Sequence, residues 1–203
     1  MQVFEKILGV YRQRPRLVKV ILLLGILGLC LGSRMAWGRY IPLEKRHFYP
    51  KTFSTSLALV DDLGLMSITP SSLELRESNE DVRAVWEFLS LKRWRLSQEE
   101  WRRALPVLDM ELRPNSLLYS RLFEVHVVAW LWEVFGIDWG VVFLFSYGLS
   151  TLACLGIFFI ARCVAGSAWA GLFASFLYAF SGTELAHSVW SIRDANPTWF
   201  FVY

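Results

Sequence analysis

The sequence predicts an all-α integral membrane protein. We expect three transmembrane helices, the start of a fourth, and an extracytoplasmic loop of juxtamembrane helices. The chain of 203 residues is 55% hydrophobic and 16% aromatic, with ten tryptophans and only 19% charged residues. This composition is too apolar for an ordinary soluble domain. The apolar residues also gather in a few long uncharged runs with a charged block between them, which is the second observation behind the prediction.

The charge balance and the cysteines exclude several functional classes. The net charge of +3 is far from the strongly basic surface of a nucleic-acid-binding domain, so nucleic acid is not an expected partner. Cys30, Cys154 and Cys163 fall in or beside apolar runs, at spacings that suit neither a metal-binding pair nor a disulfide framework. We interpret them as small hydrophobic residues.

A basic N-terminus precedes the first apolar run. Residues 1–19 hold five basic residues against one acid and are predicted to be cytoplasmic, and residues 17–37 are predicted to form the first transmembrane helix. Trp37 and Tyr40 suit the far membrane interface. A cleavable signal peptide is the alternative, although no clean cleavage site follows the run. In both cases the basic residues stay in the cytoplasm.

Residues 38–116 are predicted to form an extracytoplasmic loop with short amphipathic helices. Between Arg34 and Ser116 the chain has 13 basic and 12 acidic residues. Two helix starts are visible, one at residues 78–81 and one in the pattern Ser97-x-x-Glu100, which is a capping box.

A run of bases in this loop has two interpretations. Lys92, Arg93 and Arg95 surround Trp94, an arrangement that would suit a lipid headgroup or a sugar phosphate. The same pattern is also typical of a solvated helix face whose tryptophan packs inward.

Two further transmembrane helices are predicted at residues 139–161 and 163–183, because each run is long enough to span and carries no charge. Arg162 separates them, and so short a connection predicts an antiparallel hairpin. Small residues in both runs, such as Gly148 and Gly171, would let the helix backbones approach closely.

Residues 117–135 decide the predicted topology, because the side of the membrane on which every later segment lies depends on whether this stretch crosses the bilayer. The stretch is apolar but contains four ionisable groups. Charged groups inside a span cost on the order of 2.5–3.5 kcal/mol each near the bilayer centre. A charge-free arc that includes Phe123, Trp130, Leu131 and Val134 instead fits an interfacial aromatic helix. This placement puts Arg162 in the cytoplasm.

The predicted positions of the last segments follow from the interfacial placement of residues 117–135. Residues 184–196 become an extracytoplasmic turn dense in polar groups, on the same face as the 38–116 loop. Residues 197–203 resemble the first turns of another transmembrane helix, with Pro197 suited to a first turn. Seven residues cannot cross a hydrocarbon core of about 30 Å. We therefore expect a longer parent protein, whose missing C-terminal transmembrane helices would complete the structure.

The order of these parts resembles the N-terminal part of the C-type membrane glycosyltransferases, which include protein O-mannosyltransferases and lipid A aminoarabinose transferases. The pieces that carry the resemblance are Arg113-Pro114-Asn115, the aromatic stretch from Trp130 to Phe135-Gly136, and Trp190-Ser191-Ile192-Arg193-Asp194. The family's usual His-Pro-Pro is altered to Arg-Pro-Asn here, which makes this chain a divergent member at best.

The resemblance implies transfer of a sugar from a polyprenyl-phosphate donor to an acceptor on the outer face of the membrane. An outer carboxylate would act as general base on the acceptor hydroxyl. Asp61 and Asp62 are the candidates for this catalytic role, although the family's acidic pair usually follows the first span more closely. Alternatively, the pair caps or solvates a helix end. The expected substrate-binding residues are Arg193, which matches a phosphate with two parallel hydrogen bonds, and Asp194, His187 and Tyr119.

No cofactor is identifiable from the sequence, and a divalent cation remains compatible with the implied reaction. Glu184 and His187 are spaced to ligate together, but no third ligand accompanies them, so no metal site is predicted. The expected partners are the lipid bilayer and a polyprenyl-phosphate-linked sugar. The expected location is a bacterial inner (plasma) membrane, with several spans and a cytoplasmic N-terminus. The alternative function is a non-catalytic transporter component or assembly factor whose outer loop binds a partner.

Overall fold

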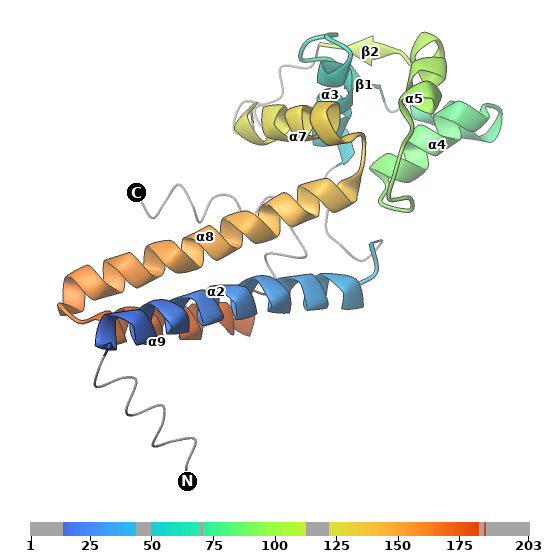
Figure 1. The fold of residues 1–203 in the computed structure, drawn as a ribbon. Coiled ribbons are helices and arrows are strands. Elements are labelled where there is room, and N and C mark those ends of the chain that lie inside the picture. The colour runs from blue at the N-terminus through green and yellow to red at the C-terminus, as the bar shows by residue number, and fades with distance from the viewer. Residues whose placement is uncertain (1–13, 44–49, 70, 113–121, 183–184, 186–203) are drawn as a thin grey trace.

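The computed structural model describes residues 14–43, 50–69, 71–112, 122–182 and Leu185. The protein is mostly helical, as predicted. Figure 1 shows two parts. The apolar helices α2 (Pro15–Tyr40), α8 (Trp139–Ala165) and α9 (Ala168–Ala179) lie side by side. The elements from α3 to α7, which are the described residues between 50 and 135, form a smaller group beyond one end of α8 that is here called the outer group. The described residues include two helices long and apolar enough to cross a membrane.

The first of these helices is α2 (Pro15–Tyr40), which begins with a proline in its first turn, where the missing N–H costs no hydrogen bond. Trp37 and Tyr40 stack with ring centroids 5.8 Å apart and remain largely exposed. The helix is longer than the predicted 17–37 segment, so that Arg39 lies on the helix and not in the loop.

The second is α8 (Trp139–Ala165), which turns at Gly166 and Ser167 into the antiparallel α9 (Ala168–Ala179). Gly166 adopts the left-handed conformation, with φ of 63°, that glycine accepts most easily. One expectation needs correction: Arg162 lies in the last turn of α8 and not in the connection. The described α9 has 12 residues, about 18 Å, and a span by the whole 163–183 segment stays a prediction.

Small residues bring the three apolar helices together. A methyl group on Gly38 of α2 would lie 2.1 Å from the Tyr147 hydroxyl of α8, and one on Gly171 of α9 would lie 2.7 Å from the Phe158 carbonyl. The side chain of Ser175 donates to the Cys154 carbonyl at 3.1 Å. The predicted close packing of α8 and α9 through small residues is confirmed at Gly171. At Gly148, by contrast, an added methyl group would meet no atom within 4 Å.

The outer group contains the only strands in the described residues, so the protein is not strictly all-α. Strand β1 (Ser67–Ile68) pairs antiparallel with β2 (Met110–Glu111), with Ser67 opposite Glu111. Helix α3 (Pro50–Val60) and the 3₁₀ helix η2 (Ser72–Glu77) flank β1 in sequence. A second 3₁₀ helix, η3 (Leu105–Val107), precedes β2.

Helices α4 (Glu80–Leu89) and α5 (Gln98–Ala104) begin where the sequence predicts. Asn79 accepts hydrogen bonds from the backbone of Asp81 and Val82, and Ser97 forms the expected capping box with Glu100. These side chains satisfy backbone N–H groups that a helix leaves unpaired in its first turn.

Helix α7 (Leu122–Phe135) packs one face on α3 and leaves the other open. Phe123, Trp130 and Val134 are exposed on the open face, as the interfacial-helix prediction requires. Leu131, expected on the same arc, is instead buried at 3% exposure. The core below α7 is aromatic, with Trp139 at its centre against Phe53, Phe88, Trp132 and Phe143. This core fastens the outer group to the start of α8.

Candidate functional site

A groove of about 580 Å³ lies where α2 ends and α8 begins. Arg39 lines it from the last turn of α2, and Phe143 and Tyr147 line it from α8. Trp94 contributes from the loop between α4 and α5. The remaining lining residues are Met35, Gly38, Ile41, Pro42, Leu43, Gly140 and Leu144. The groove is therefore mostly apolar, with a guanidinium at its edge.

Backbone pairing holds Trp94 at this groove. The Trp139 N–H donates to the Trp94 carbonyl at 3.0 Å, and the Leu96 N–H donates to the Ile137 carbonyl at 3.0 Å. The Trp94 ring meets Phe143 edge-on with centroids 5.9 Å apart, and 44% of the residue remains exposed. A fixed and half-open aromatic ring of this kind is suited to contact a bound ligand.

The first turns of α8 contribute Gly140, Phe143 and Leu144 to the groove that Arg39 also lines. Asp138 caps this helix by accepting from the Gly140 N–H at 2.7 Å, and its other oxygen accepts from Arg95 Nε at 2.5 Å. The carboxylate of Asp138 is thereby neutralised by Arg95. The positive end of the α8 dipole and the Arg39 guanidinium then leave the groove favourable for a negatively charged group.

The predicted catalytic pair lies elsewhere, at the C-terminal end of α3. The Leu63 N–H donates to the Ala58 carbonyl, and the Asp62 N–H donates to the Leu59 carbonyl, which is the hydrogen-bond pattern of a Schellman motif. Asp62 has φ of 57°, the left-handed conformation usually given to glycine at this position. The alternative interpretation, an acidic pair at a helix end, therefore describes the local structure, although it is the C-terminal and not the N-terminal end.

Asp61 is held by an ion pair and is separated from the groove. Its Oδ1 lies 3.5 Å from Arg102 Nε, its side chain is 20% exposed, and its Oδ2 is buried without a hydrogen-bond partner. Phe53, near the start of α3, contacts Trp139 at the start of α8. Asp61 follows Phe53 by eight residues, about 12 Å along the helix. Figure 1 shows the far end of α3 pointing away from α2 and α8.

The four predicted substrate-binding residues, Tyr119, His187, Arg193 and Asp194, lie outside the described residues. The same holds for the 1–13 part of the N-terminus, the Arg113-Pro114-Asn115 segment and most of the predicted outer turn. Their proximity to the groove stays a prediction. Among the described residues, no group of three His, Cys, Asp or Glu side chains is arranged to hold a metal ion.

The run of bases around Trp94 is divided among separate contacts. Lys92 lies over the Trp86 ring with 4.4 Å to its centroid, Arg93 pairs with Glu100 at 2.9 Å, and Arg95 binds Asp138. These three side chains make contacts within the protein, but they lie in the loop between α4 and α5 and not on a helix face. Trp94, however, faces the groove and does not pack inward.

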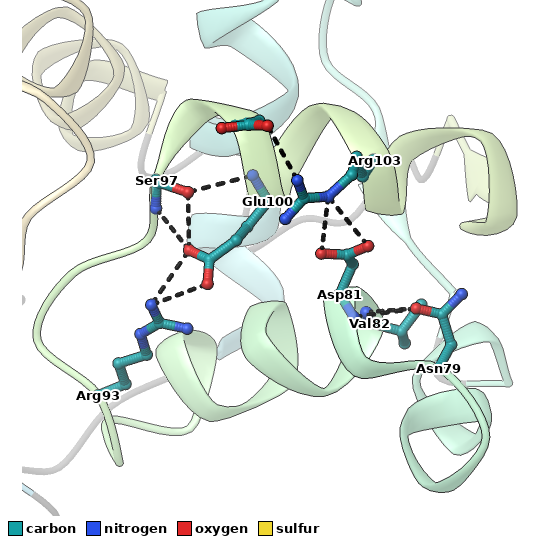
Figure 2. A network of polar contacts seen from close by, with 8 residues as sticks. Asn79, Asp81, Val82, Arg93, Ser97, Glu100 and Arg103 are labelled. Carbon is teal, nitrogen blue, oxygen red and sulfur yellow. Dashed lines mark hydrogen bonds and ion pairs between the residues drawn. The ribbon is translucent and has the colours of Figure 1, made fainter.

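Figure 2 shows the polar network between α4 and α5 to which Arg93 belongs. Glu100 accepts from the Ser97 N–H at 2.9 Å and from its hydroxyl at 2.8 Å, and Arg103 pairs with Asp81 at 3.1 Å. Burial alone raises the pKa of Glu100, but the Ser97 hydrogen bonds and the Arg93 charge together hold that pKa below its ordinary value. Each of the two arginines of this network is paired with at least one carboxylate, and we assign the network to holding α4 against α5.

Comparison with known proteins does not assign this chain to a family. No protein-family model, no curated protein and no solved structure matches this chain. The resemblance to C-type glycosyltransferases accordingly remains a prediction from the sequence.

Sequence reasoning missed Arg39 and Tyr147 as residues of the groove. Arg39 follows Trp37 by two positions, and a base just past a predicted transmembrane helix is a usable signal for a phosphate-binding group. Tyr147 gives no such signal, because it sits in the middle of an uncharged run. Only the contact with Gly38 places its hydroxyl at the groove.

Proposed function

We propose that the protein is a multi-pass membrane protein in which α2, α8 and the segment containing α9 cross the bilayer. Its outer group would lie on the extracytoplasmic side of a bacterial inner membrane. Exposed leucines and isoleucines along α2, such as Ile21 and Leu24, support contact with lipid. The open apolar face of α7 supports the interfacial placement, and the bases at the N-terminal end of α2 support a cytoplasmic N-terminus.

We further propose that the groove between α2 and α8 binds the phosphate of a polyprenyl-phosphate-linked sugar. The single observation that carries this proposal is the combination of Arg39 with an otherwise apolar set of lining residues in one groove. The guanidinium and the start of α8 suit the phosphate. Leu144 and Met35, both exposed, suit the prenyl chain, and Trp94 suits the face of a sugar ring.

The proposed reaction is transfer of that sugar to an acceptor hydroxyl. The acceptor oxygen forms a bond to the anomeric carbon, and the bond from that carbon to the phosphate oxygen breaks with its electron pair leaving on the phosphate. A carboxylate takes the hydroxyl proton. Arg39 would stabilise the phosphate leaving group. Asp61, the base expected from the sequence, lies at the end of α3 away from this groove, so an acceptor at the groove would need another carboxylate as its base.

A binding assay tests the first step. The purified full chain in detergent is titrated with a polyprenyl monophosphate and followed by native mass spectrometry. Because Arg39 would supply a charge-assisted hydrogen bond, Arg39→Gln is expected to weaken binding about tenfold. Arg83→Gln removes an exposed base of α4 and serves as the matched control. Equal binding by wild type and Arg39→Gln would show that the groove does not hold the phosphate.

A second candidate is a non-catalytic protein that binds the lipid-linked sugar without transferring it. Two observations on the carboxylates favour this candidate. No described carboxylate lines the groove, so none is placed to act as a base there. In addition, four carboxylates of the outer group and the start of α8 are held in ion pairs, namely Asp61, Asp81, Glu100 and Asp138. Incubation with a polyprenyl-phosphate hexose in membranes separates the two. Release of free polyprenyl phosphate that is lost in Arg39→Gln supports transfer, whereas binding without release supports the second candidate.

A further inference from the structure

A second groove, of about 480 Å³, lies at the opposite end of the same helix pair. Here the first turns of α2 meet the last turns of α8 and the start of α9. Arg16 and Lys19 line it from α2, Arg162 lines it from α8, and none of its eight described lining residues is acidic. The groove therefore concentrates three positive charges with no carboxylate among its described lining residues.

The charges and the apolar residues of this groove are separated along the helix axes. Arg16, Lys19 and Leu23 share one face of α2 at spacings of three and four residues, and Leu23 lies about 10 Å deeper than Arg16. On α8, Phe158 lies one turn deeper than Arg162. The cations thus form the rim and the apolar side chains form the floor, as a phosphate headgroup with an attached acyl chain requires.

Aromatic residues also place this groove at an interface between water and lipid. The Lys19 ammonium lies 5.8 Å from the centroid of the Trp169 ring, and Trp169 itself is half exposed. Tryptophan beside lysine at a helix end is typical of the membrane interface. Basic pockets between helices on the cytoplasmic side are a common form of anionic lipid site.

We propose that this groove is a binding site for an anionic phospholipid of the inner leaflet, with its phosphate held by Arg16, Lys19 and Arg162. The inference rests on the proposed membrane insertion but not on sugar transfer. It assigns a second phosphate-lipid site, on the opposite side of the membrane from the Arg39 groove.

The test uses the purified full chain in detergent and native mass spectrometry with three probes. These are phosphatidylglycerol, phosphatidylcholine, and glycerol 1-phosphate, which has the headgroup chemistry without acyl chains. Phosphatidylglycerol is expected to bind and phosphatidylcholine to bind at least about fivefold more weakly, with Arg162→Gln reducing phosphatidylglycerol binding by about fivefold. Lys92→Gln, which neutralises an exposed base of the outer group, is the matched control and is expected to leave binding unchanged.

Three outcomes would overturn the proposal. Equal binding of the two phospholipids would show that charge does not select the ligand. Effective competition by glycerol 1-phosphate would show a site for free phosphate instead of a lipid. Loss of binding in Lys92→Gln to the same extent as in Arg162→Gln would show a general effect of charge. Because Arg39→Gln is measured with polyprenyl phosphate and Arg162→Gln with phosphatidylglycerol, either proposal can fail without the other.

Discussion

Arg34 is the most deeply buried charged residue among those described, and it joins three helices. From α2 its guanidinium donates to the Ser150 hydroxyl of α8 at 2.6 Å and to the Ala179 carbonyl of α9 at 3.4 Å. One of its nitrogens, Nη2, is buried without a hydrogen-bond partner. A cation beside the last carbonyls of a helix is favourable. We therefore infer that Arg34 fixes the end of α9 against α2, at the cost of leaving the Nη2 amino group without a hydrogen bond.

At the residue scale, the backbone at Asp62 leads to the first prediction. Asp62 is held at positive φ, a conformation that disfavours residues with a side chain, and its charge faces the negative end of the α3 dipole. Asp62→Gly removes both penalties, so we expect it to raise the free energy of unfolding by about 0.5–1 kcal/mol. Chemical denaturation of the full chain in detergent, followed by tryptophan fluorescence, measures this.

Asp62→Asn separates the two effects. Asparagine also tolerates the left-handed conformation, so this variant relieves only the charge and should gain less than Asp62→Gly. A loss of stability in Asp62→Gly would contradict the backbone argument, and equal gains in both variants would assign the effect to charge alone.

Glu100 leads to the second prediction, which concerns pH. Its pKa is lowered in the folded protein, so its contribution to stability is fully present above its ordinary pKa of about 4.3 and is lost as the pH falls through the lowered value. We expect Glu100→Gln to be less stable than wild type at neutral pH and to lose less stability between about pH 5 and pH 3. Denaturation curves across this range provide the measurement.

Glu74→Gln is the control for that experiment, because Glu74 is an exposed glutamate at the start of η2. It should follow the wild-type pH profile closely. A Glu100→Gln profile that runs parallel to wild type throughout would show that the Ser97 and Arg93 contacts do not stabilise the ionised carboxylate.

At the element scale, the contact between α2 and α8 leads to the third prediction. A methyl group at Gly38 would collide with the Tyr147 hydroxyl at 2.1 Å, whereas one at Gly148 would meet no atom within 4 Å. Gly38→Ala is therefore expected to lower the free energy of unfolding by about 1–3 kcal/mol, while Gly148→Ala leaves it nearly unchanged. Thermal unfolding in detergent compares the two variants.

A double variant tests whether contact with the Tyr147 hydroxyl causes the loss of stability in Gly38→Ala. Tyr147→Phe removes the atom closest to the added methyl, although the ring carbon Cζ would still lie 2.9 Å away. We expect Gly38→Ala with Tyr147→Phe to recover part of the loss beyond the sum of the single effects. Additive effects would mean that Gly38→Ala acts through another contact.

Elements with local signals were the most predictable part of the fold. Asn79 and the Ser97–Glu100 pair mark helix starts through side chains that bond their own backbone, so the sequence alone reveals them. For helix α3 the sequence indicated only a helix end at Asp61 and Asp62, and the helix itself contains the polar residues Ser54, Thr55 and Ser56. These three residues are buried, and Ser56 donates to the Val125 carbonyl of α7, a contact that local sequence does not encode.

At the scale of the whole molecule, long apolar runs predicted the two membrane-length helices but not how polar groups meet between them. The groove combines Arg39, Trp94 and Tyr147 from three distant segments, and their proximity depends on the backbone pairing of residues 94–96 with 137–139. Asp61 and Asp62 were selected by residue type and resemblance. Neither consideration could show that α3 directs them away from the apolar helices.

Topology gives the fourth prediction, and the chain carries its own probe. Cys163 is exposed in the last turn of α8, whereas Cys30 and Cys154 are buried. If the bases at this end face the cytoplasm, a membrane-impermeant maleimide should label Cys163 only after intact cells are permeabilised. In a Cys163→Ser background, Asp62→Cys on the outer group should be labelled in intact cells, because Asp62 is exposed. Labelling of both positions from the same side would place α8 outside the membrane, and both lipid sites would lose their basis. Labelling of Cys163 alone in intact cells would invert the orientation and exchange the membrane faces assigned to the Arg39 and Arg162 grooves.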